Sequence, residues 1–351
     1  MQAAAVAGQI VLRYPDPAAR FVAVALVSEL FKREPPRPFT RRRPGEHWEL
    51  RFPQPDADRL EYLLLLRYAH GLSVLACDPD APAAPGPFGE KSVLELPLYA
   101  APAWLGVDAE KGVLRPLDLP SRRLRARVEG ALWAPPGTPS DEPLPFLVVH
   151  DGPEYAAYSQ LLRFLDALAG ARRLPPLRAA LLAPVLRNEH YSASARYAAA
   201  LADELLPALA VQAPSPPGRR WRVGMGASLG ALALLHAHRR HPGTFGALFL
   251  QSGSFFRQRF DRQEAGFPRF RRITRFMGTV LDAASPPDPI PIGMTCGSAE
   301  ENLRNNRAIA VALTAHGYPV ALHEQRDAHN WVAWRDSLDP HLVALLERAW
   351  A

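Results

Sequence analysis

The chain is poor in cysteine: its 351 residues contain only Cys77 and Cys296. These two residues fall in different predicted domains, so no network of disulfides of the kind that stabilises small secreted proteins is indicated. Each is interpreted as a small buried apolar residue rather than as a reactive thiol. We therefore expect a fold that is stabilised by hydrophobic cores.

The chain also lacks a segment that fits a secretory signal or a membrane span. Its first apolar stretch, residues 3–12, has no basic residues before it and runs directly into a Tyr-Pro-Asp-Pro break. A signal peptide begins with a basic region, and a spanning helix needs about 20 apolar residues. The sequence thus predicts a cytoplasmic protein without a membrane partner.

Internal repeats are absent as well, and basic residues are not gathered in one place. The formal net charge is +6, but the arginines are spread along the chain apart from the short run Arg41-Arg42-Arg43. A concentrated basic patch is typical of nucleic-acid-binding proteins. We expect no nucleic-acid partner and interpret the arginines as solvated surface residues. The alternative is that they bind an anionic substrate.

Length and proline distribution predict two domains, because 351 residues are enough for two buried cores. A proline-rich seam runs from Pro116 to Pro145 and contains a strand-like piece, residues 124–133, which we expect to open the second sheet. The boundary is placed near residue 120. The predicted domains are residues 1–120 and 121–351.

A Gly-x-Ser-x-Gly motif at residues 226–230 is the most informative stretch of the chain. It lies between an apolar run, residues 221–225, and a helical pattern of small residues, 231–238. A nucleophile elbow places its serine on a sharp strand-to-helix turn, and glycines beside the serine leave room for that turn. We predict Ser228 as a nucleophile and the N–H of Leu229 as an oxyanion donor. The alternative is a glycine-rich packing turn.

Two glutamates follow a second strand-like run beyond the motif. Residues 290–295 are typical of a buried parallel strand, and Glu300 and Glu301 lie in the loop beyond it. The acid of a triad belongs at such a strand end. A helical pattern begins at residue 302, so either glutamate could simply favour a helix N-terminus. We prefer Glu300 as the acid and interpret Glu301 as a first-turn carboxylate.

The candidate base is His329. It follows a strand-like segment, residues 320–325, and precedes a terminal helical pattern, residues 334–351. A histidine in the loop between the last strand and the last helix can reach the elbow, whereas other histidines lie on or beside the elbow helix. Asp327 is a rival acid, and its closeness to His329 in the sequence counts against it.

Residues from about 124 to 351 resemble the putative-esterase family of α/β-hydrolases, which includes enterochelin esterases, S-formylglutathione hydrolases, feruloyl esterases and mycolyltransferases. Besides the elbow, the resemblance is carried by His150-Asp151-Gly152-Pro153-Glu154-Tyr155, Arg187-Asn188-Glu189-His190-Tyr191, Cys296-Gly297-Ser298-Ala299-Glu300-Glu301-Asn302 and Asp327-Ala328-His329-Asn330-Trp331. It implies an α/β-hydrolase fold with a Ser228, His329 and Glu300 triad, without a metal or organic cofactor. It also implies an oxyanion donor after the strand at residues 146–149. Pro153 has no N–H, so Gly152 and Glu154 are the candidate donors.

Residues from about 13 to 105 resemble the all-β N-terminal domain of enterochelin esterases, through Trp48-Glu49-Leu50, Arg59-Leu60-Glu61-Tyr62 and Phe88-Gly89-Glu90-Lys91-Ser92. Alternating apolar runs such as residues 60–68, separated by proline-containing breaks, predict a small immunoglobulin-like sandwich. This resemblance makes a ferric catecholate siderophore the leading substrate. Modules of this type also serve as glycan-binding or structural domains.

The segment 255–276 alternates phenylalanine with arginine beyond the strand at residues 246–251. Aromatic faces stack on planar rings, and guanidinium groups bind anionic oxygens. The alternative is a lid whose phenylalanines pack inward while its arginines are solvated. The substrate-binding candidates from this segment and the family motifs are Phe255, Phe256, Arg257, Tyr155, Arg187 and Trp331.

The sequence as a whole predicts a serine esterase. Ser228 would attack an ester carbonyl, His329 would take and return the proton, and Glu300 would orient the imidazole. Any iron would arrive as part of the substrate. The alternatives are a broad carboxylesterase or acyltransferase that uses the same triad, and a catalytically silent ligand-binding protein.

Overall fold

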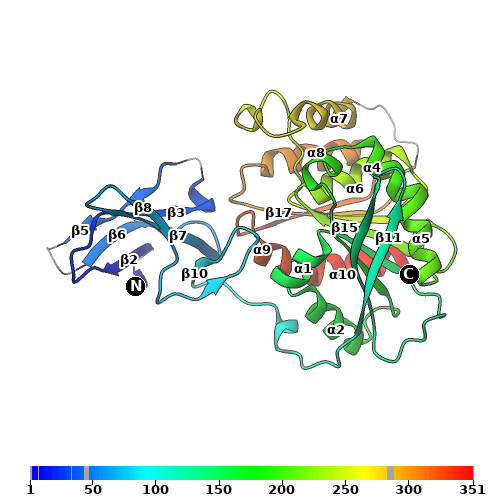
Figure 1. Cartoon of the computed structure of the whole chain (residues 1–351), viewed down its shortest axis with the longest axis horizontal. Helices are drawn as coiled ribbons and strands as arrows, with labels where there is room; N and C mark the ends of the chain where they lie inside the picture. Colours follow the sequence, from blue (N-terminus) through cyan, green and yellow to red (C-terminus); the bar gives the residue numbers. More distant parts are fainter. Residues whose placement is uncertain (1, 7, 33, 43–46, 283–287, 351) are drawn as a thin grey trace. The chain divides into compact units, whose positions relative to one another are not determined.

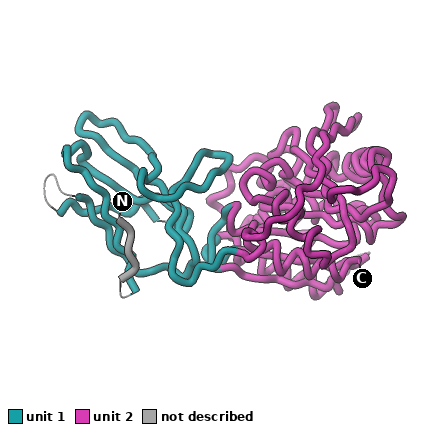
Figure 2. Tube along the Cα trace, turned by 90° about the horizontal axis from the view of Figure 1, so that it is seen from below, with its two compact units in different colours: residues 1–101, 297–300, 326–330 teal, residues 102–296, 301–325, 331–351 magenta. Residues whose placement is uncertain are grey.

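The computed structural model describes residues 2–6, 8–32, 34–42, 47–282 and 288–350. Arg43 and Ala351 lie outside the described residues. Contacts divide the chain into two compact units, shown in Figure 2. Unit 1 contains residues 1–101 together with two short segments, 297–300 and 326–330. Unit 2 contains residues 102–296, 301–325 and 331–351.

Unit 1 consists of two sheets whose strands pair antiparallel. The first has the order β1 (Gln2–Val6), β2 (Gln9–Pro15), β6 (His47–Pro53) and β5 (Thr40–Arg41). The second has the order β4 (Arg37–Pro38), β3 (Phe21–Ser28), β7 (Arg59–Tyr68), β10 (Lys91–Glu95) and β9 (Ala83–Ala84), and β8 (Ser73–Ala76) pairs with β7. A short 3-10 helix, Glu29–Phe31, follows β3.

One buried cluster joins the two sheets of unit 1. It includes Ile10 and Leu12 of β2, and Leu60 and Leu64 of β7. On β7 every second residue from Leu60 to Leu66 is buried. Because side chains alternate between the faces of a strand, this spacing gives each sheet one apolar face. The alternation expected at residues 60–68 is therefore present.

Unit 2 contains an eight-stranded sheet with the order β11 (Val113–Ser121), β12 (Ala126–Ala134), β14 (Arg178–Leu182), β13 (Phe146–His150), β15 (Arg222–Ala227), β16 (Ala247–Gln251), β17 (Ile292–Gly297) and β18 (Val320–Gln325). The pairs β11–β12 and β12–β14 are antiparallel, and the strands from β14 to β17 pair in parallel. All residues of β13, β14, β16 and β17 are buried. Such uniformly buried strands are typical of a parallel sheet that is covered on both faces.

Helices cover both faces of this sheet, as Figure 1 shows. Their bounds are α1 (Gly152–Tyr158), α2 (Leu161–Ala171), α3 (Arg187–His190), α4 (Ala195–Ala200), α5 (Leu206–Gln212), α6 (Leu229–Arg240), α7 (Phe270–Asp282), α8 (Leu303–Ala315), α9 (Trp331–Asp336) and α10 (Val343–Trp350). Among the described residues, unit 2 also has two π-helical turns, Leu201–Leu205 and Leu338–Leu342, and three 3-10 helices, Ala103–Gly106, Arg219–Trp221 and Arg262–Glu264.

Neighbouring residues of β13 belong to opposite cores. Val148 packs in the cluster that contains residues of α6, α7 and α8, whereas Val149 packs in the cluster that contains residues of α2 and α10.

No helix among the described residues has the length and apolar character needed to cross a membrane.

The strand that opens the sheet of unit 2 differs from the expected one. We expected residues 124–133 to open it, but β11 precedes them and pairs with β12 along its whole length. Pro116 and Pro120 of β11 made this region resemble a linker. An edge strand tolerates proline because one row of its N–H groups has no partner strand. The units divide between Ala101 and Pro102, so residue 120 lies near the end of a strand of unit 2.

The terminal helix also differs from the expected one, which spanned residues 334–351. Helix α9 begins earlier, at Trp331, and Leu338–Leu342 separates it from α10. Asp339, in that turn, has non-helical angles, φ −116° and ψ 122°. Its neighbour Pro340 lacks an N–H group and disfavours helical angles in the residue before it. The helical pattern is therefore interrupted.

Candidate active site

Ser228 lies in the one-residue turn between β15 and α6. Its backbone angles are φ 54° and ψ −118°, which side-chain-bearing residues rarely adopt. A Cβ atom on Gly226 would lie 2.9 Å from the carbonyl carbon of Gly230, and one on Gly230 would lie 3.2 Å from the Cβ of His150. Both glycines are therefore needed for the close approach of strand and helix. The turn expected from the motif is present.

The hydroxyl of Ser228 contacts a second serine. The Oγ atoms of Ser228 and Ser254 are 2.9 Å apart, and the N–H of Ser254 donates to the carbonyl of Ser228 at 3.1 Å. Ser254 is buried and follows β16 at the carboxyl edge of the sheet. The sequence analysis missed it, although the Ser-Gly-Ser directly after a buried strand was a usable signal.

Side chains from α8 and α9 hold the loop that carries Ser254. The amide of Asn306 accepts from the N–H of Gly253 and donates to its carbonyl, both at 3.0 Å. Asn302 donates to the carbonyl of Ser252 at 3.0 Å, and the indole N–H of Trp334 donates to the Oγ of Ser252 at 2.9 Å. These bonds satisfy the buried peptide groups of the loop.

A buried histidine supports the elbow from β13. Burial lowers the pKa of His150 to about 3, so its ring is neutral near pH 7. A neutral imidazole has one donor and one acceptor nitrogen. The carbonyl of Gly230 can only accept, at 3.2 Å from Nδ1, so Nδ1 carries the proton and Nε2 accepts from the hydroxyl of Tyr197 at 2.9 Å.

The expected oxyanion donors lie at the starts of two helices. Leu229 is the first residue of α6, where N–H groups have no acceptor within the helix. Gly152 begins α1, and a Cβ atom there would lie 2.3 Å from the Cα of Leu181, so this position requires glycine. Glu154 is in the first turn of α1. Because β13 and β15 are parallel neighbours, both helix starts lie at the same edge of the sheet.

Glu300, which is buried, and His329, which is partly exposed, form a pair in unit 1. The Nδ1 of His329 lies 2.8 Å from Oε2 of Glu300, and the N–H of Gly297 donates to Oε1 of the same carboxylate at 2.8 Å. The Glu300 side chain is 1% exposed. Their loops directly follow β17 and β18, which are neighbours in the sheet. A carboxylate at Nδ1 fixes the ring and leaves Nε2 for other chemistry. Glu301 lies in the turn before α8 and is half-buried.

The oxygens of Asp327, the rival acid, bind groups of its own loop and an arginine. Oδ1 accepts from the N–H of Ala328 at 2.7 Å and from the amide of Asn330 at 2.8 Å. Oδ2 lies 3.4 Å from Nη1 of Arg59, which is itself buried. Burial raises the pKa of Asp327 to about 6, and the charge of Arg59 opposes this rise. Asp327 therefore shapes the loop in which His329 lies.

Two of the six substrate-binding candidates are fully buried. Tyr155 is 0% exposed, and its hydroxyl donates to the side chain of Gln251. Phe255 is also 0% exposed, and its ring occupies the space that a side chain at Gly253 would need. Both rings pack inward, and contact of these two residues with substrate stays a prediction.

The other candidates are partly exposed. Arg187 forms a two-bond ion pair with Asp151, with both N–O distances 2.8 Å. Trp331 is half-buried, and its ring meets those of Tyr155 and Trp334 edge-on at 5.3 and 4.8 Å. Phe256 packs on Phe267, with ring centroids 5.7 Å apart. These two rings thus pack against each other.

Arginines gather around one aromatic ring, that of Phe260. The guanidinium carbons of Arg257, Arg259 and Arg304 lie 4.6, 6.0 and 3.9 Å from its centroid. Such distances are typical of cation–π contacts. Arg257 is three residues after Ser254, the partner of Ser228. The sequence analysis missed Arg304 because it belongs to α8 and only the fold brings it to this segment. We call Phe260 and these arginines the Phe260 cluster.

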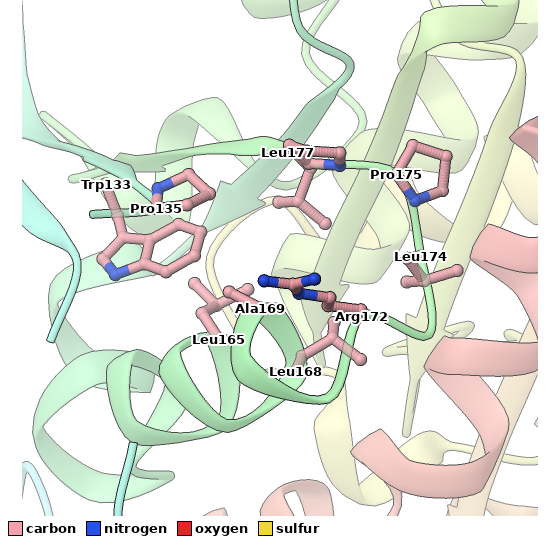
Figure 3. Close-up of a pocket in the computed structure, with 10 residues that line it drawn as sticks. Trp133, Pro135, Leu165, Leu168, Ala169, Arg172, Leu174, Pro175 and Leu177 are labelled. Atoms are coloured by element: carbon pink, nitrogen blue, oxygen red, sulfur yellow. The ribbon is translucent and has the colours of Figure 1, made fainter. Parts of the chain in front are cut away.

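A separate apolar cavity of about 290 Å³ lies away from the elbow. Figure 3 shows that its lining includes Leu165 and Leu168 of α2, Leu177 and Trp133, with Arg172 nearby. Leu177 immediately precedes β14, whose first residue is Arg178. Arg178 pairs in register with Phe146 of β13, and Phe146 pairs with Arg222, the first residue of β15. The cavity therefore lies at the amino edge of the parallel strands, opposite Ser228.

Comparisons with known proteins give a family and a curated relative. The family model described as Putative esterase matches residues 121–345. A curated relative, the Iron(III) enterobactin esterase of Dickeya dadantii (strain 3937), is 29% identical over 211 residues, which cover 57% of this chain and 47% of that protein. The match thus spans about half the length of this relative.

Solved structures show the same fold over nearly the whole chain. The enterobactin esterase of Shigella flexneri, solved in the presence of 2,3-dihydroxy-N-benzoyl-serine, is 19% identical with a TM-score of 0.78, covering 100% of this chain and 97% of that one. The ferric enterobactin esterase of Salmonella typhimurium is 19% identical with a TM-score of 0.74, covering 97% and 93%. The expected α/β-hydrolase type of fold is confirmed.

The buried carboxyl of Asp327 predicts a distinct pH dependence of stability. Its folded pKa of about 6 exceeds its ordinary value of 3.8. The contribution of the protonated Asp327 carboxyl to the free energy of unfolding is therefore complete below pH 4, and it is lost as the pH rises through 6. Asp327→Asn cannot ionise. We expect the free energy of unfolding of the native chain to fall by roughly 3 kcal/mol relative to the variant between pH 4 and 7.

Urea unfolding followed by tryptophan fluorescence at each pH measures this difference, and Asp108→Asn, an exposed carboxyl in unit 2, is the matched control. A difference between the native chain and Asp327→Asn that stays constant from pH 4 to 7 would contradict the raised pKa.

Proposed function

The chain belongs to the Putative esterase family, and we propose that it hydrolyses carboxylic esters with a triad of Ser228, His329 and Glu300. The contact that carries this proposal is the 2.8 Å approach of Glu300 to Nδ1 of His329. It leaves a single ring nitrogen to serve as the base. The chain order of nucleophile, acid and histidine is that of α/β-hydrolases.

In the proposed reaction, the Oγ of Ser228 attacks the ester carbonyl while Nε2 of His329 takes its proton. The N–H of Leu229 and that of Gly152 or Glu154 stabilise the oxyanion. The imidazolium returns its proton to the departing alcohol, and water then hydrolyses the acyl-enzyme by the same steps. Glu300 stabilises the imidazolium, and Ser254 positions the resting hydroxyl through the 2.9 Å contact between the two Oγ atoms.

We further propose a catecholate siderophore ester as the substrate. A curated relative is an Iron(III) enterobactin esterase, and a structure of the same fold was solved in the presence of enterobactin. The Phe260 cluster supports this proposal because it combines an aromatic ring with cationic groups close in sequence to Ser254. Aromatic rings stack on catechols, and guanidinium groups bind their anionic oxygens. Iron would enter only with the substrate.

The two sheets of unit 1 are proposed to form the immunoglobulin-like sandwich expected from the sequence, since one apolar cluster contains residues of both. The cytoplasm remains the proposed location. A general carboxylesterase is the second candidate function, because the inward packing of Phe255 and Phe256 suits a structural lid.

The first test concerns the nucleophile. Ser228→Ala removes the attacking hydroxyl, and we expect turnover of a short-chain nitrophenyl ester to fall to about 10³-fold over the uncatalysed rate. Labelling by a fluorophosphonate probe should disappear. Ser215→Ala, in a surface loop of unit 2, is the control and should keep both. Native-like hydrolysis by Ser228→Ala would remove the elbow from the mechanism.

The second test separates the three acids. Glu300→Gln keeps an acceptor for the N–H of Gly297 but no longer stabilises the imidazolium, so kcat should fall by up to about 10⁴-fold. Glu301→Gln and Asp327→Asn should retain most of the native kcat. If either of these variants loses activity while Glu300→Gln keeps it, the acid has been assigned to the wrong residue.

The third test concerns the substrate. Replacing Arg257, Arg259 and Arg304 together by Gln should raise KM for a catecholate ester at least about tenfold, because charge-assisted contacts are lost. KM for an uncharged acyl ester should stay near the native value. Arg163→Gln/Arg348→Gln, at exposed positions of α2 and α10, is the control. Equal changes for both esters would favour the general carboxylesterase.

A further inference from the structure

Besides the apolar cavity at α2, unit 2 contains a groove of about 610 Å³ that lies among α3, α4, α6 and α7. Basic side chains from three of these helices line it: Arg196, Arg240, Arg272 and Arg275. His190 and His236 line it as well. We call this the arginine groove. Its volume falls in the range of small-molecule sites, about 300–1,000 Å³.

The groove has more positive charge than the protein neutralises. Glu189 is the acidic residue in its lining, and it already binds both Arg272 and Arg269. Within the described part of the chain, Arg196, Arg240 and Arg275 take part in no ion pair. Like charges that converge without a counterion repel one another, and a bound anion relieves that repulsion.

Two histidines show the effect of this charge. His236 is buried against the ring of Phe276, and its pKa falls to about 4 through burial and the charges of Arg240, Arg272 and His241. The pKa of His190 is lowered by burial and by Arg196 and Arg272, against Glu189. His190 is 4% exposed, and its Nδ1 has no hydrogen-bond partner among the described residues. A buried nitrogen of this kind normally has a hydrogen-bond partner, which can be a ligand group or an ordered water.

The arginine groove is separate from the elbow. His236 and Arg240 lie 8 and 12 residues beyond Ser228 on α6, which corresponds to roughly 12 and 18 Å along the helix axis. Ser228, Ser254 and the Phe260 cluster are not part of its lining. An occupant would therefore leave the candidate active site open.

We infer that the arginine groove binds a small polyanion that carries at least two carboxylate or phosphate groups. Guanidinium groups match both anions with paired hydrogen bonds. Because the arginines project from three helices, a ligand with separated charges can contact several of them at once. This inference does not depend on the proposed triad.

Titration calorimetry with citrate and with pyrophosphate tests the inference, at constant ionic strength set with sodium chloride. The native chain should bind at least one of them saturably at one site, and the tighter of the two identifies carboxylate or phosphate as the preferred group. Arg240→Gln/Arg275→Gln should weaken binding at least about tenfold, since each lost contact involves two charged partners. Arg163→Gln/Arg348→Gln should bind as the native chain does.

Two further variants keep the result interpretable. Ser228→Ala should bind the anion unchanged, which separates this site from the proposed triad. If Arg240→Gln/Arg275→Gln does not fold, Arg196→Gln/Arg275→Gln replaces it, because Arg196 and Arg275 are both exposed. Binding that is absent, or equal in the groove variants and the Arg163→Gln/Arg348→Gln control, would overturn the inference.

Discussion

The strained turn at Ser228 is the constraint on which the rest of unit 2 depends. A positive φ at a residue with a side chain is unfavourable, and it persists only where the surroundings hold it. Here the surroundings are the close approach of Gly226 to Gly230, the carbonyl of Gly230 bound by His150, and the loop of Ser254. Together they place the Ser228 hydroxyl at the carboxyl edge of the sheet, beside the first N–H groups of α6.

Two carboxylates in neighbouring loops have different tasks because their partners differ. Glu300 meets an imidazole and a backbone N–H, whereas Asp327 meets Arg59 and groups of its own loop. Both loops belong to unit 1 by their contacts, and the N–H of Asp58 donates to the carbonyl of Arg326. The β-rich N-terminal residues thus contribute to the shape of the loop that carries His329. This gives the N-terminal region a structural part in the proposed chemistry.

The segment 255–276 combines the two interpretations that its composition allowed. Phe255 and Phe270 are buried, and Phe256 packs beside Phe267, so much of its aromatic content is core. Four of its arginines lie in two separate places. Arg257 and Arg259 surround Phe260, whereas Arg272 and Arg275 line the arginine groove. A single Arg/Phe-rich stretch therefore contributes to two cationic surfaces.

The sequence by itself determined the family, the central strands and the elbow, because these depend on local patterns: apolar runs, glycine spacing and the order of motifs. Tertiary structure alone decided the partners of each side chain. Arg304 reaches Phe260 and Arg59 reaches Asp327 across distances in sequence that no local pattern encodes. Burial of Tyr155 and Phe255 was likewise hidden, since an aromatic residue in the first turns of a helix or after a strand end can face a ligand or the core, and only packing decides which.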